Sequence, residues 1–552
     1  TLRFPLTNTF DKDRIHTVKK KHQNQKKYLT SFDSRAFPHV FTDVLVIGSG
    51  VAGLSAAIQA ARSGSALVVT KDKLDENNTT YAQGGIAVAL ADKDTIAKHT
   101  KDTLDAGQRL CNASVVKTMV SEGPSRVKDL IEWGAKFDRE DDQLIFTKEG
   151  GHQFPRIIRA QGDSTGREVE STLIRVVREN RNIKIFEHTF AIDLITKDGV
   201  CHGIITWHAK RGYVLIWAKR TVLAAGGCGQ VYRETTNPDV ATGDGIAMAY
   251  RAGAVLQDME FVQFHPTTLY IAGAVRFLIT ETVRGEGGIL RNSKGARFMP
   301  DYHPQAELAP RDVVSQSILK EMQKTGHTCV YLDVRHIPQE RLYTRFPKIK
   351  EICASFGIDI AADLIPVRPS AHYMIGGVKV DRFCKTAVKQ LYACGETACT
   401  GMHGANRLGS NSLLEGLVTG YTAGIDACKS IRRAKRDLAP YTVQETLGLS
   451  KISWLDLNDI RNSLKSLMWR DAGIERDEMR LLEAEEMIQM WCSYVLDKEF
   501  SHPAGWELQN MLLVSGLIVS AARKRKESRG VHHRTDYPQT DNTRWKKHIV
   551  SS

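Results

Sequence analysis

Histidines, arginines, a threonine and a glutamate lie beside glycines at several points between residues 254 and 415. This mixture suits a pocket for a small dicarboxylic acid. Each carboxylate needs a bidentate arginine, or paired histidine and hydroxyl donors, to replace its water. Taken one at a time, such residues are more often structural hydrogen-bonding groups. The segments concerned are 263–267, 280–288, 309–312, 370–373 and 404–415.

The elements that would position this pocket begin with a glycine-rich loop. Residues 43–47 form a short apolar run typical of a buried strand, and the Ala-rich run 54–61 predicts a helix. Between them, Gly48 allows a tight turn, Gly50 lets a pyrophosphate approach the backbone, and Gly53 lets the helix pack against the strand. The helix N-terminus offers free N–H groups to phosphates. The context predicts a dinucleotide site rather than a purely structural turn.

Lys71 bears on the identity of the dinucleotide. An NAD-type fold usually places an acidic residue after its second strand, where this chain has Lys71 after the run 65–70. Further glycine-rich strand ends follow at 221–227 and 390–396. A flavin with an extended ADP tail needs several such contacts along the chain. We therefore predict FAD as the cofactor.

The composition of the 552-residue chain is that of an ordinary globular protein, 42% hydrophobic and 25% charged. Its net charge is +13, which suits an anionic cofactor and a small anionic substrate. Basic runs such as 19–21 and 523–526 are interpreted as solvated. Because no aromatic residues are interleaved with them, nucleic-acid binding is not expected.

The ten cysteines include no C-x-x-C pair, which argues against zinc or iron–sulfur ligation, and no metal is expected. Neither a signal peptide nor an apolar run of roughly 20 residues is visible, so no membrane span is expected. We predict a cytoplasmic protein with reduced thiols.

The pattern of apolar residues predicts an α/β protein that ends in helices. From about residue 440 helical periodicity dominates, as at 479–491, and the run 511–522 predicts a core helix. The first 40 residues are polar, basic and aperiodic, which predicts a flexible arm. Strands are expected at 183–186, 203–207, 213–217 and 221–225.

From about Thr42 to Pro538 the chain resembles the flavoprotein family of succinate dehydrogenases, fumarate reductases and L-aspartate oxidases. The resemblance implies a discontinuous Rossmann-like FAD-binding domain, an inserted α+β capping domain and a C-terminal helical domain. The predicted boundaries are 1–40 for the arm, 41–257 and 374–438 for the FAD-binding domain, 258–373 for the capping domain and 439–552 for the helical domain. The shared motifs are the loop at Gly48, 81–85, 241–245, the segments around His265 and Arg284, Arg311, His372, 395–396, 411–413 and 527–530.

The resemblance implies which residues bind FAD. They come from the glycine loop, the end of the next strand, the segment 78–85 and three positions later in the chain. They are Gly48, Ser49, Gly50, Val51, Ala52, Gly53, Lys71, Asn78, Thr79, Thr80, Tyr81, Ala82, Gln83, Gly84, Gly85, Asp244, Glu396, Ser412 and Leu413.

It also implies how a dicarboxylate is held. His265 and Thr280 would bind one carboxylate, with Leu278 nearby. His372 and Arg407 would bind the other.

Arg311 would then lie over the carbon next to the flavin as proton acceptor or donor. Glu281 and Arg284 would form a relay that connects it to solvent. An arginine can play this part only in a crowded, positively charged and dry site.

Two positions distinguish branches of the family. Succinate dehydrogenases and membrane-bound fumarate reductases carry a histidine joined covalently to FAD where this chain has Asn78, so non-covalent FAD is predicted. Segment 121–126 resembles L-aspartate oxidases in carrying Glu122, a carboxylate that could pair with an α-ammonium group. The alternative for Glu122 is an exposed helix residue.

These positions favour the L-aspartate oxidase branch. Such enzymes convert L-aspartate to iminoaspartate, pass the electrons to oxygen or fumarate, and supply quinolinate synthase on the route to NAD. Met374 and Ile375 depart from this branch, which tends to have Thr and Cys there. A soluble fumarate reductase or succinate dehydrogenase-type flavoprotein is therefore the alternative. A non-catalytic FAD-delivery protein would lack the pocket residues, which are all present.

Overall fold

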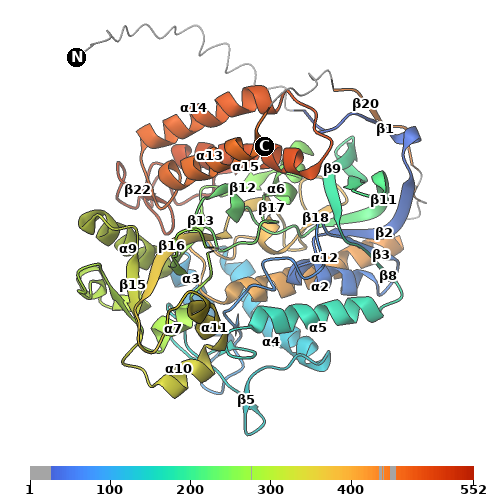
Figure 1. Cartoon of the computed structure of the whole chain (residues 1–552). Helices are drawn as coiled ribbons and strands as arrows, with labels where there is room; N and C mark the ends of the chain where they lie inside the picture. The colour runs from blue at the N-terminus through green and yellow to red at the C-terminus, as the bar shows by residue number, and fades with distance from the viewer. Residues whose placement is uncertain (1–25, 275, 434–437, 439, 448–454) are drawn as a thin grey trace, which may run out of the picture.

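The computed structural model describes residues 26–552 except 275, 434–437, 439 and 448–454. Figure 1 shows three long helices from the C-terminal part of the chain gathered at the top of the view. The elements between residues 281 and 355 lie at the left and below, and the central sheet lies at the right. No helix of the described part is long and apolar enough to cross a membrane.

A seven-stranded sheet forms the centre of the FAD-binding part. Its order is β8-β3-β2-β11-β10-β9, with β18 also paired to β11. The pairs β8–β3, β3–β2, β2–β11 and β11–β18 are parallel. The pairs β11–β10 and β10–β9 are antiparallel, so β10 and β9 form an antiparallel extension. The strands are β2 (His39–Ile47), β3 (Ala66–Val69), β8 (Ile183–Phe186), β9 (Thr189–Lys197), β10 (Val200–His208), β11 (Gly212–Leu223) and β18 (Leu391–Ala393). The two runs predicted at 213–217 and 221–225 form one strand, β11.

Helices α2 (Val51–Ala60) and α12 (Asn411–Arg433) pack closely beside this sheet. Gly420 and Gly424 lie four residues apart on one face of α12. A Cβ added at either would lie 2.3 or 2.4 Å from a carbonyl oxygen of α2. The two glycines therefore allow backbone contact between the helices, which places the start of α12 beside the glycine loop.

The capping part has its own sheet and core. The sheet order is β13-β16-β15-β14, all antiparallel, and apolar residues between 269 and 367 pack beneath it. Its strands are β13 (Val262–Leu269), β14 (Ile289–Arg291), β15 (Val330–Asp333) and β16 (Ile365–Met374), and its helices are α7 (Glu281–Gly285), α8 (Met299–Tyr302), α9 (Arg311–Thr325), α10 (Gln339–Arg345) and α11 (Pro347–Ser355).

Three helices near the C-terminus pack against the FAD-binding part. They are α13 (Leu457–Asp471), α14 (Glu478–Val495) and α15 (Pro503–Lys524). The predicted core helix 511–522 lies within α15 and is mostly buried. After it, the chain returns to the FAD-binding part, where β23 (Val550–Ser551) pairs with β12 (Leu256–Gln257).

The remaining elements are short or peripheral. The helices are α3 (Ile96–Ala106), α4 (Ala113–Glu132), α5 (Thr165–Glu179) and α6 (Asp244–Arg251). The strands are β1 (Phe32–Asp33), β4 (Ile86–Ala87), β5 (Arg139–Glu140), β6 (Gln143–Leu144), β7 (Ile157–Ile158), β17 (Gly377–Lys379), β19 (Ala398–Cys399), β20 (Gln444–Glu445), β21 (Glu475–Arg476) and β22 (His533–Arg534).

The prediction of a flexible arm over residues 1–40 is wrong for residues 26–40. Tyr28, Leu29 and Phe32 are buried in the largest apolar cluster, and β2 already begins at His39. These apolar side chains stabilise the segment by leaving water. Residues 1–25 lie outside the described residues.

The basic run 523–526 is likewise not a solvated face along its whole length. Arg525 is fully buried, and its Nε lies 2.6 Å from Glu260 Oε1 while its Nη1 lies 2.9 Å from Glu527 Oε1. A guanidinium can be buried in this way because both carboxylates compensate its charge.

Candidate active site

A single cavity of about 1700 Å³, its open mouth included, runs from the glycine loop to the capping sheet. Most of the residues predicted to bind FAD line it, together with the residues predicted to bind substrate. From the first group these are Gly48, Ser49, Gly50, Val51, Ala52, Lys71, Asn78, Thr79, Tyr81, Ala82, Gln83, Gly84, Gly85, Asp244, Glu396, Ser412 and Leu413. From the second group they are His265, Leu278, Thr280, Arg311, His372 and Arg407. Within the described part of the chain, Gly53, Thr80, Glu281, Arg284 and Glu122 do not line it.

The glycine loop has the geometry that its sequence predicts. Gly48 has φ +111°, and a Cβ there would lie 2.1 Å from the carbonyl oxygen of Ala224. A Cβ at Gly53 would lie 2.1 Å from the carbonyl oxygen of Gly48. At Gly50 the nearest such contact is 3.1 Å, to Thr79 Oγ1. Gly48 and Gly53 therefore permit close packing, while Gly50 leaves its backbone open to the cavity.

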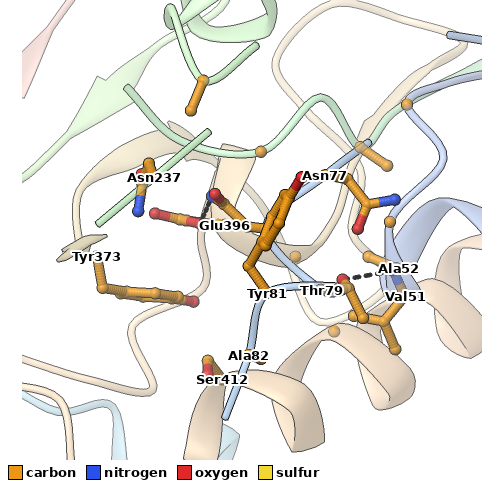
Figure 2. Close-up of a pocket in the computed structure, with 18 of the residues that line it drawn as sticks. Val51, Ala52, Asn77, Thr79, Tyr81, Ala82, Asn237, Tyr373, Glu396 and Ser412 are labelled. Atoms are coloured by element: carbon orange, nitrogen blue, oxygen red, sulfur yellow. Dashed lines mark hydrogen bonds between the residues drawn. The ribbon is translucent and has the colours of Figure 1, made fainter. Parts of the chain in front are cut away.

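The cavity wall offers unused hydrogen-bond acceptors. Among the described residues, Asn78 Oδ1, Gln83 Oε1 and Asn237 Oδ1 are buried and have no partner. Figure 2 shows Asn237, Glu396 and Tyr373 on one side of the space and Val51 and Ala52 on the other. Buried polar atoms without partners are costly, and they fit a ligand rich in N–H and hydroxyl donors. FAD carries such groups, so the residues fit this cofactor.

Two charged groups of the wall are held by protein neighbours. Lys71 Nζ lies 2.7 Å from both Asp244 Oδ2 and Glu507 Oε1, so this lysine joins β3 to α6 and α15. Glu396 accepts hydrogen bonds from Asn78 Nδ2 at 3.1 Å and from the Met374 backbone N–H at 2.8 Å. Burial raises the pKa of Glu396 to about 7. These groups fix the shape and charge of the wall.

Asn78 leads to a prediction about the flavin. A carboxamide does not form the covalent bond that a histidine can form with FAD, so denaturation by acid or heat should release yellow FAD. The measurement is flavin fluorescence in the supernatant and in the precipitated protein after centrifugation. Fluorescence that stays with the polypeptide would contradict non-covalent binding.

At the other end of the cavity two histidines lie together. The rings of His265 (on β13) and His372 (on β16) have centroids 5.2 Å apart. Burial lowers the pKa of each well below its ordinary value, and Arg311 lowers both further. His372 Nδ1 lies 2.9 Å from Thr236 Oγ1. Both rings are therefore neutral at pH 7, and each can act as donor or acceptor according to its tautomer.

Arg407 presents unused donors in the same place. Its Nη1 donates to Ser412 Oγ at 3.2 Å, while Nε and Nη2 are buried without a partner among the described residues. Its guanidinium lies 4.4 Å from the ring centroid of Tyr373. Burial lowers the pKa of Arg407 to about 10, which leaves it charged at neutral pH. The free fork suits a carboxylate.

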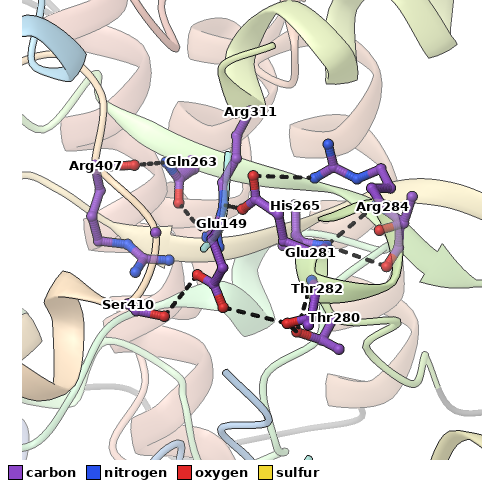
Figure 3. A network of polar contacts seen from close by, with 12 residues as sticks. Glu149, Gln263, His265, Thr280, Glu281, Thr282, Arg284, Arg311, Arg407 and Ser410 are labelled. Carbon is purple, nitrogen blue, oxygen red and sulfur yellow. Dashed lines mark hydrogen bonds and ion pairs between the residues drawn. The ribbon is translucent and has the colours of Figure 1, made fainter. Parts of the chain in front are cut away.

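Arg311 is positioned by two neighbours, as Figure 3 shows. Its Nε donates to Glu281 Oε2 at 2.7 Å, and its Nη1 donates to Gln263 Oε1 at 3.1 Å. Gln263 Nε2 in turn donates to the Arg407 carbonyl at 2.8 Å. Gln263 therefore couples the two arginines, a role that its sequence motif did not reveal.

Arg311 contacts Glu281, and Glu281 contacts Arg284, so the two residues predicted as its relay follow it in the predicted order. Arg284 Nη2 lies 3.6 Å from Glu281 Oε1, on the far side of Glu281 from Arg311. Burial alone would raise the pKa of Glu281, but Arg311 and Arg284 outweigh it and lower the pKa below its ordinary value. Arg284 is fully buried and donates to the Glu307 carbonyl.

The prediction that Glu122 lies beside the substrate is wrong. Glu122 is an exposed residue in the middle of α4, and the described residues place its side chain outside the cavity. Glu149, by contrast, is a buried carboxylate that lines the cavity. A Cβ added at Gly409 would lie 3.0 Å from Glu149 Oε2 and 3.2 Å from Arg311 Nη2, so Glu149 and Arg311 flank the same point. Glu149 is followed by glycines, as the other pocket segments are, but Glu122 also precedes a glycine, so the local sequence did not reveal this role.

Comparison with known proteins shows the family of the chain. Residues 43–413 match the family described as FAD binding domain, and residues 461–552 match the fumarate reductase flavoprotein C-terminal family. An L-aspartate oxidase of Nicotiana tabacum is 44% identical, covering 91% of this chain and 82% of its own length. One of Streptomyces coelicolor is 41% identical, with 93% and 91% covered.

Solved structures of related flavoproteins are also similar. The FrdA chain of E. coli quinol fumarate reductase is 32% identical, with a TM-score of 0.86, and 93% of this chain and 94% of that chain are covered. Sdh1 of Mycobacterium smegmatis is 34% identical with a TM-score of 0.81, and 93% and 92% are covered. The chain therefore belongs to the L-aspartate oxidases, within the succinate dehydrogenase and fumarate reductase flavoprotein family.

Proposed function

We propose that this chain binds FAD without a covalent bond and oxidises L-aspartate to iminoaspartate, with oxygen or fumarate as the final electron acceptor. One observation carries the proposal. A single cavity joins an FAD-binding wall to histidine, threonine and arginine side chains that can bind carboxylates, and Arg311 and Glu149 line the same cavity and flank one point beside Gly409. A flavin site alone would not need this second set of residues.

The two ends of the pocket would hold the two carboxylates of the substrate. Arg407, with two donors that have no partner in the described part of the chain, and His372 would bind one, while His265 and Thr280 would bind the other. Glu149 would then pair with the α-ammonium group, the role first predicted for Glu122. Holding three charged groups at once fixes the carbon skeleton in a single orientation.

Arg311 would move the proton. Proton loss from the β-carbon to Arg311, together with hydride loss from the α-carbon, gives the enamine tautomer of iminoaspartate. Arg311 Nε donates to Glu281 Oε2 at 2.7 Å, so this hydrogen bond is the route by which a proton would pass between Arg311 and the relay. FAD, when bound, supplies the two-electron acceptor for the hydride. In the reverse direction Arg311 would donate the proton to fumarate.

Two further parts belong to this proposal. A quinolinate synthase would consume the iminoaspartate, and the protein would act in the cytoplasm. The ten cysteines, all within the described residues, have free thiols, which fits a reducing compartment.

The test is anaerobic mixing of the FAD-loaded protein with L-aspartate or succinate while flavin absorbance is followed. L-Aspartate should bleach the flavin, and subsequent addition of oxygen or fumarate should restore the colour. Bleaching by succinate in preference to L-aspartate would instead indicate a succinate dehydrogenase or fumarate reductase.

A further inference from the structure

Glu149 already has a cationic partner before any substrate binds. Arg159, which follows β7, places its Nη2 2.7 Å from Glu149 Oε1, and each side chain is 1% exposed. Ser410 Oγ donates to the other carboxylate oxygen at 2.8 Å. The protein therefore already compensates the charge of the carboxylate that is proposed to bind the α-ammonium group, and it also donates a hydrogen bond to that carboxylate.

Arg159 forms its ion pair with Glu149. Glu149 is the one carboxylate that Arg159 contacts in the described part of the chain, and Nη2 also contacts Thr282 Oγ1. Arg159 Nε and Nη1 are buried without partners among the described residues. Burial lowers the pKa of Arg159, and Glu149 counteracts this effect. Because Arg159 lies behind Glu149 and does not line the cavity as described, it can act on a ligand only through this carboxylate and through its charge.

We propose that Arg159 limits how strongly the pocket prefers an α-amino dicarboxylate over a plain one; this rests on the proposed function. An amine-free ligand leaves Glu149 paired with Arg159, so it does not incur the cost of a bare buried carboxylate. An α-ammonium group must share Glu149 with Arg159 and is repelled by the guanidinium. Both effects reduce the ratio of the succinate Kd to the L-aspartate Kd. Arg159 is thus a positioning residue that sets specificity.

The test replaces Arg159 by Gln, which removes the charge and keeps an N–H donor for Glu149. The rate of anaerobic flavin reduction against L-aspartate concentration gives the Kd of L-aspartate, and competition by succinate gives its Kd. The ratio of the succinate Kd to the L-aspartate Kd should rise about tenfold, the size expected when one nearby charge is removed. An unchanged or lower ratio overturns the proposal.

Two matched variants separate this effect from general damage. Arg159→Lys keeps the charge and should keep the ratio of the unsubstituted protein, whereas a merely structural role would not be rescued by Lys. Arg345→Gln removes a nearby arginine whose partner is Glu286, outside the cavity in the described structure, and should also leave the ratio unchanged. A tenfold rise in either variant would contradict a specific role of Arg159.

A second comparison avoids an unpaired buried carboxylate if Arg159→Gln does not fold. Glu149→Gln and the double variant Glu149→Gln/Arg159→Gln differ only in the guanidinium of residue 159. Because this guanidinium repels the α-ammonium group, the double variant should have the higher ratio of the succinate Kd to the L-aspartate Kd. No such difference would overturn the proposal. If L-aspartate fails to reduce the flavin of the unsubstituted protein, the proposed function fails, and this result is distinct from an unchanged ratio.

Discussion

Replacing Arg311 by leucine is expected to leave FAD bound and to abolish its reduction by L-aspartate. Leucine keeps much of the side-chain volume but offers neither a donor to Gln263 nor a base for the β-carbon proton. The reduction rate at saturating L-aspartate should fall by at least roughly 10² to 10⁴-fold, the usual effect of losing a general base. Rapid mixing under anaerobic conditions measures this rate, and the flavin spectrum reports binding of FAD.

The saturating rate separates two roles of Arg311. A residue that only binds a carboxylate would raise the L-aspartate concentration needed for half-maximal reduction and leave the saturating rate nearly intact. Arg335→Leu is the matched control, because Arg335 is a half-exposed arginine of the capping part that pairs with Asp333. It should retain the full rate. If Arg311→Leu also retains most of its rate, the proton-transfer role is excluded.

Glu149→Gln is expected to remove the preference for L-aspartate. The variant loses the charge that pairs with the α-ammonium group, and it leaves Arg159 to repel that group. The kcat/KM for L-aspartate should fall about ten- to a hundredfold, as when a charged hydrogen bond is lost. Fumarate reduction with an artificial donor should survive or improve. The ratio of the two kcat/KM values is the quantity to compare.

Glu122→Gln is the control for this prediction, since it is the same substitution at an exposed site on α4. The ratio of kcat/KM for L-aspartate to kcat/KM for fumarate should not change in this variant. If the ratio falls in Glu122→Gln and not in Glu149→Gln, the assignment of the amine site to Glu149 is wrong.

Local sequence was sufficient for the elements that depend on neighbouring residues. The glycine loop, β8 and the buried helix within α15 follow from apolar periodicity and from the spacing of Gly48, Gly50 and Gly53. The position of α12 against α2 could not be predicted in this way. It depends on glycines of α12 that meet the backbone of a helix more than 300 residues earlier.

The candidate site shows the same limit. Glu122 and Glu149 both precede a glycine, and nothing local distinguishes them. Glu149 is placed in the cavity wall by contacts with Arg159 and Ser410, and Ser410 is 261 residues away in the chain. Arg525 is similar, because its buried partner Glu260 comes from another part of the chain. Residue type therefore predicted the chemistry, whereas long-range packing determined which residue carries it.

The order of strands in the central sheet has a consequence for synthesis of the protein. The nucleotide loop after β2 leaves the ribosome early, yet β18 and α12 are made only from residues 391 and 411 onward. Until then, the α2 surface that α12 covers remains exposed to water, and the cavity lacks Glu396 and Ser412. The nascent chain must carry an incomplete FAD site through translation of the whole capping part. Transiently exposed apolar surface of this kind makes a folding intermediate prone to aggregation.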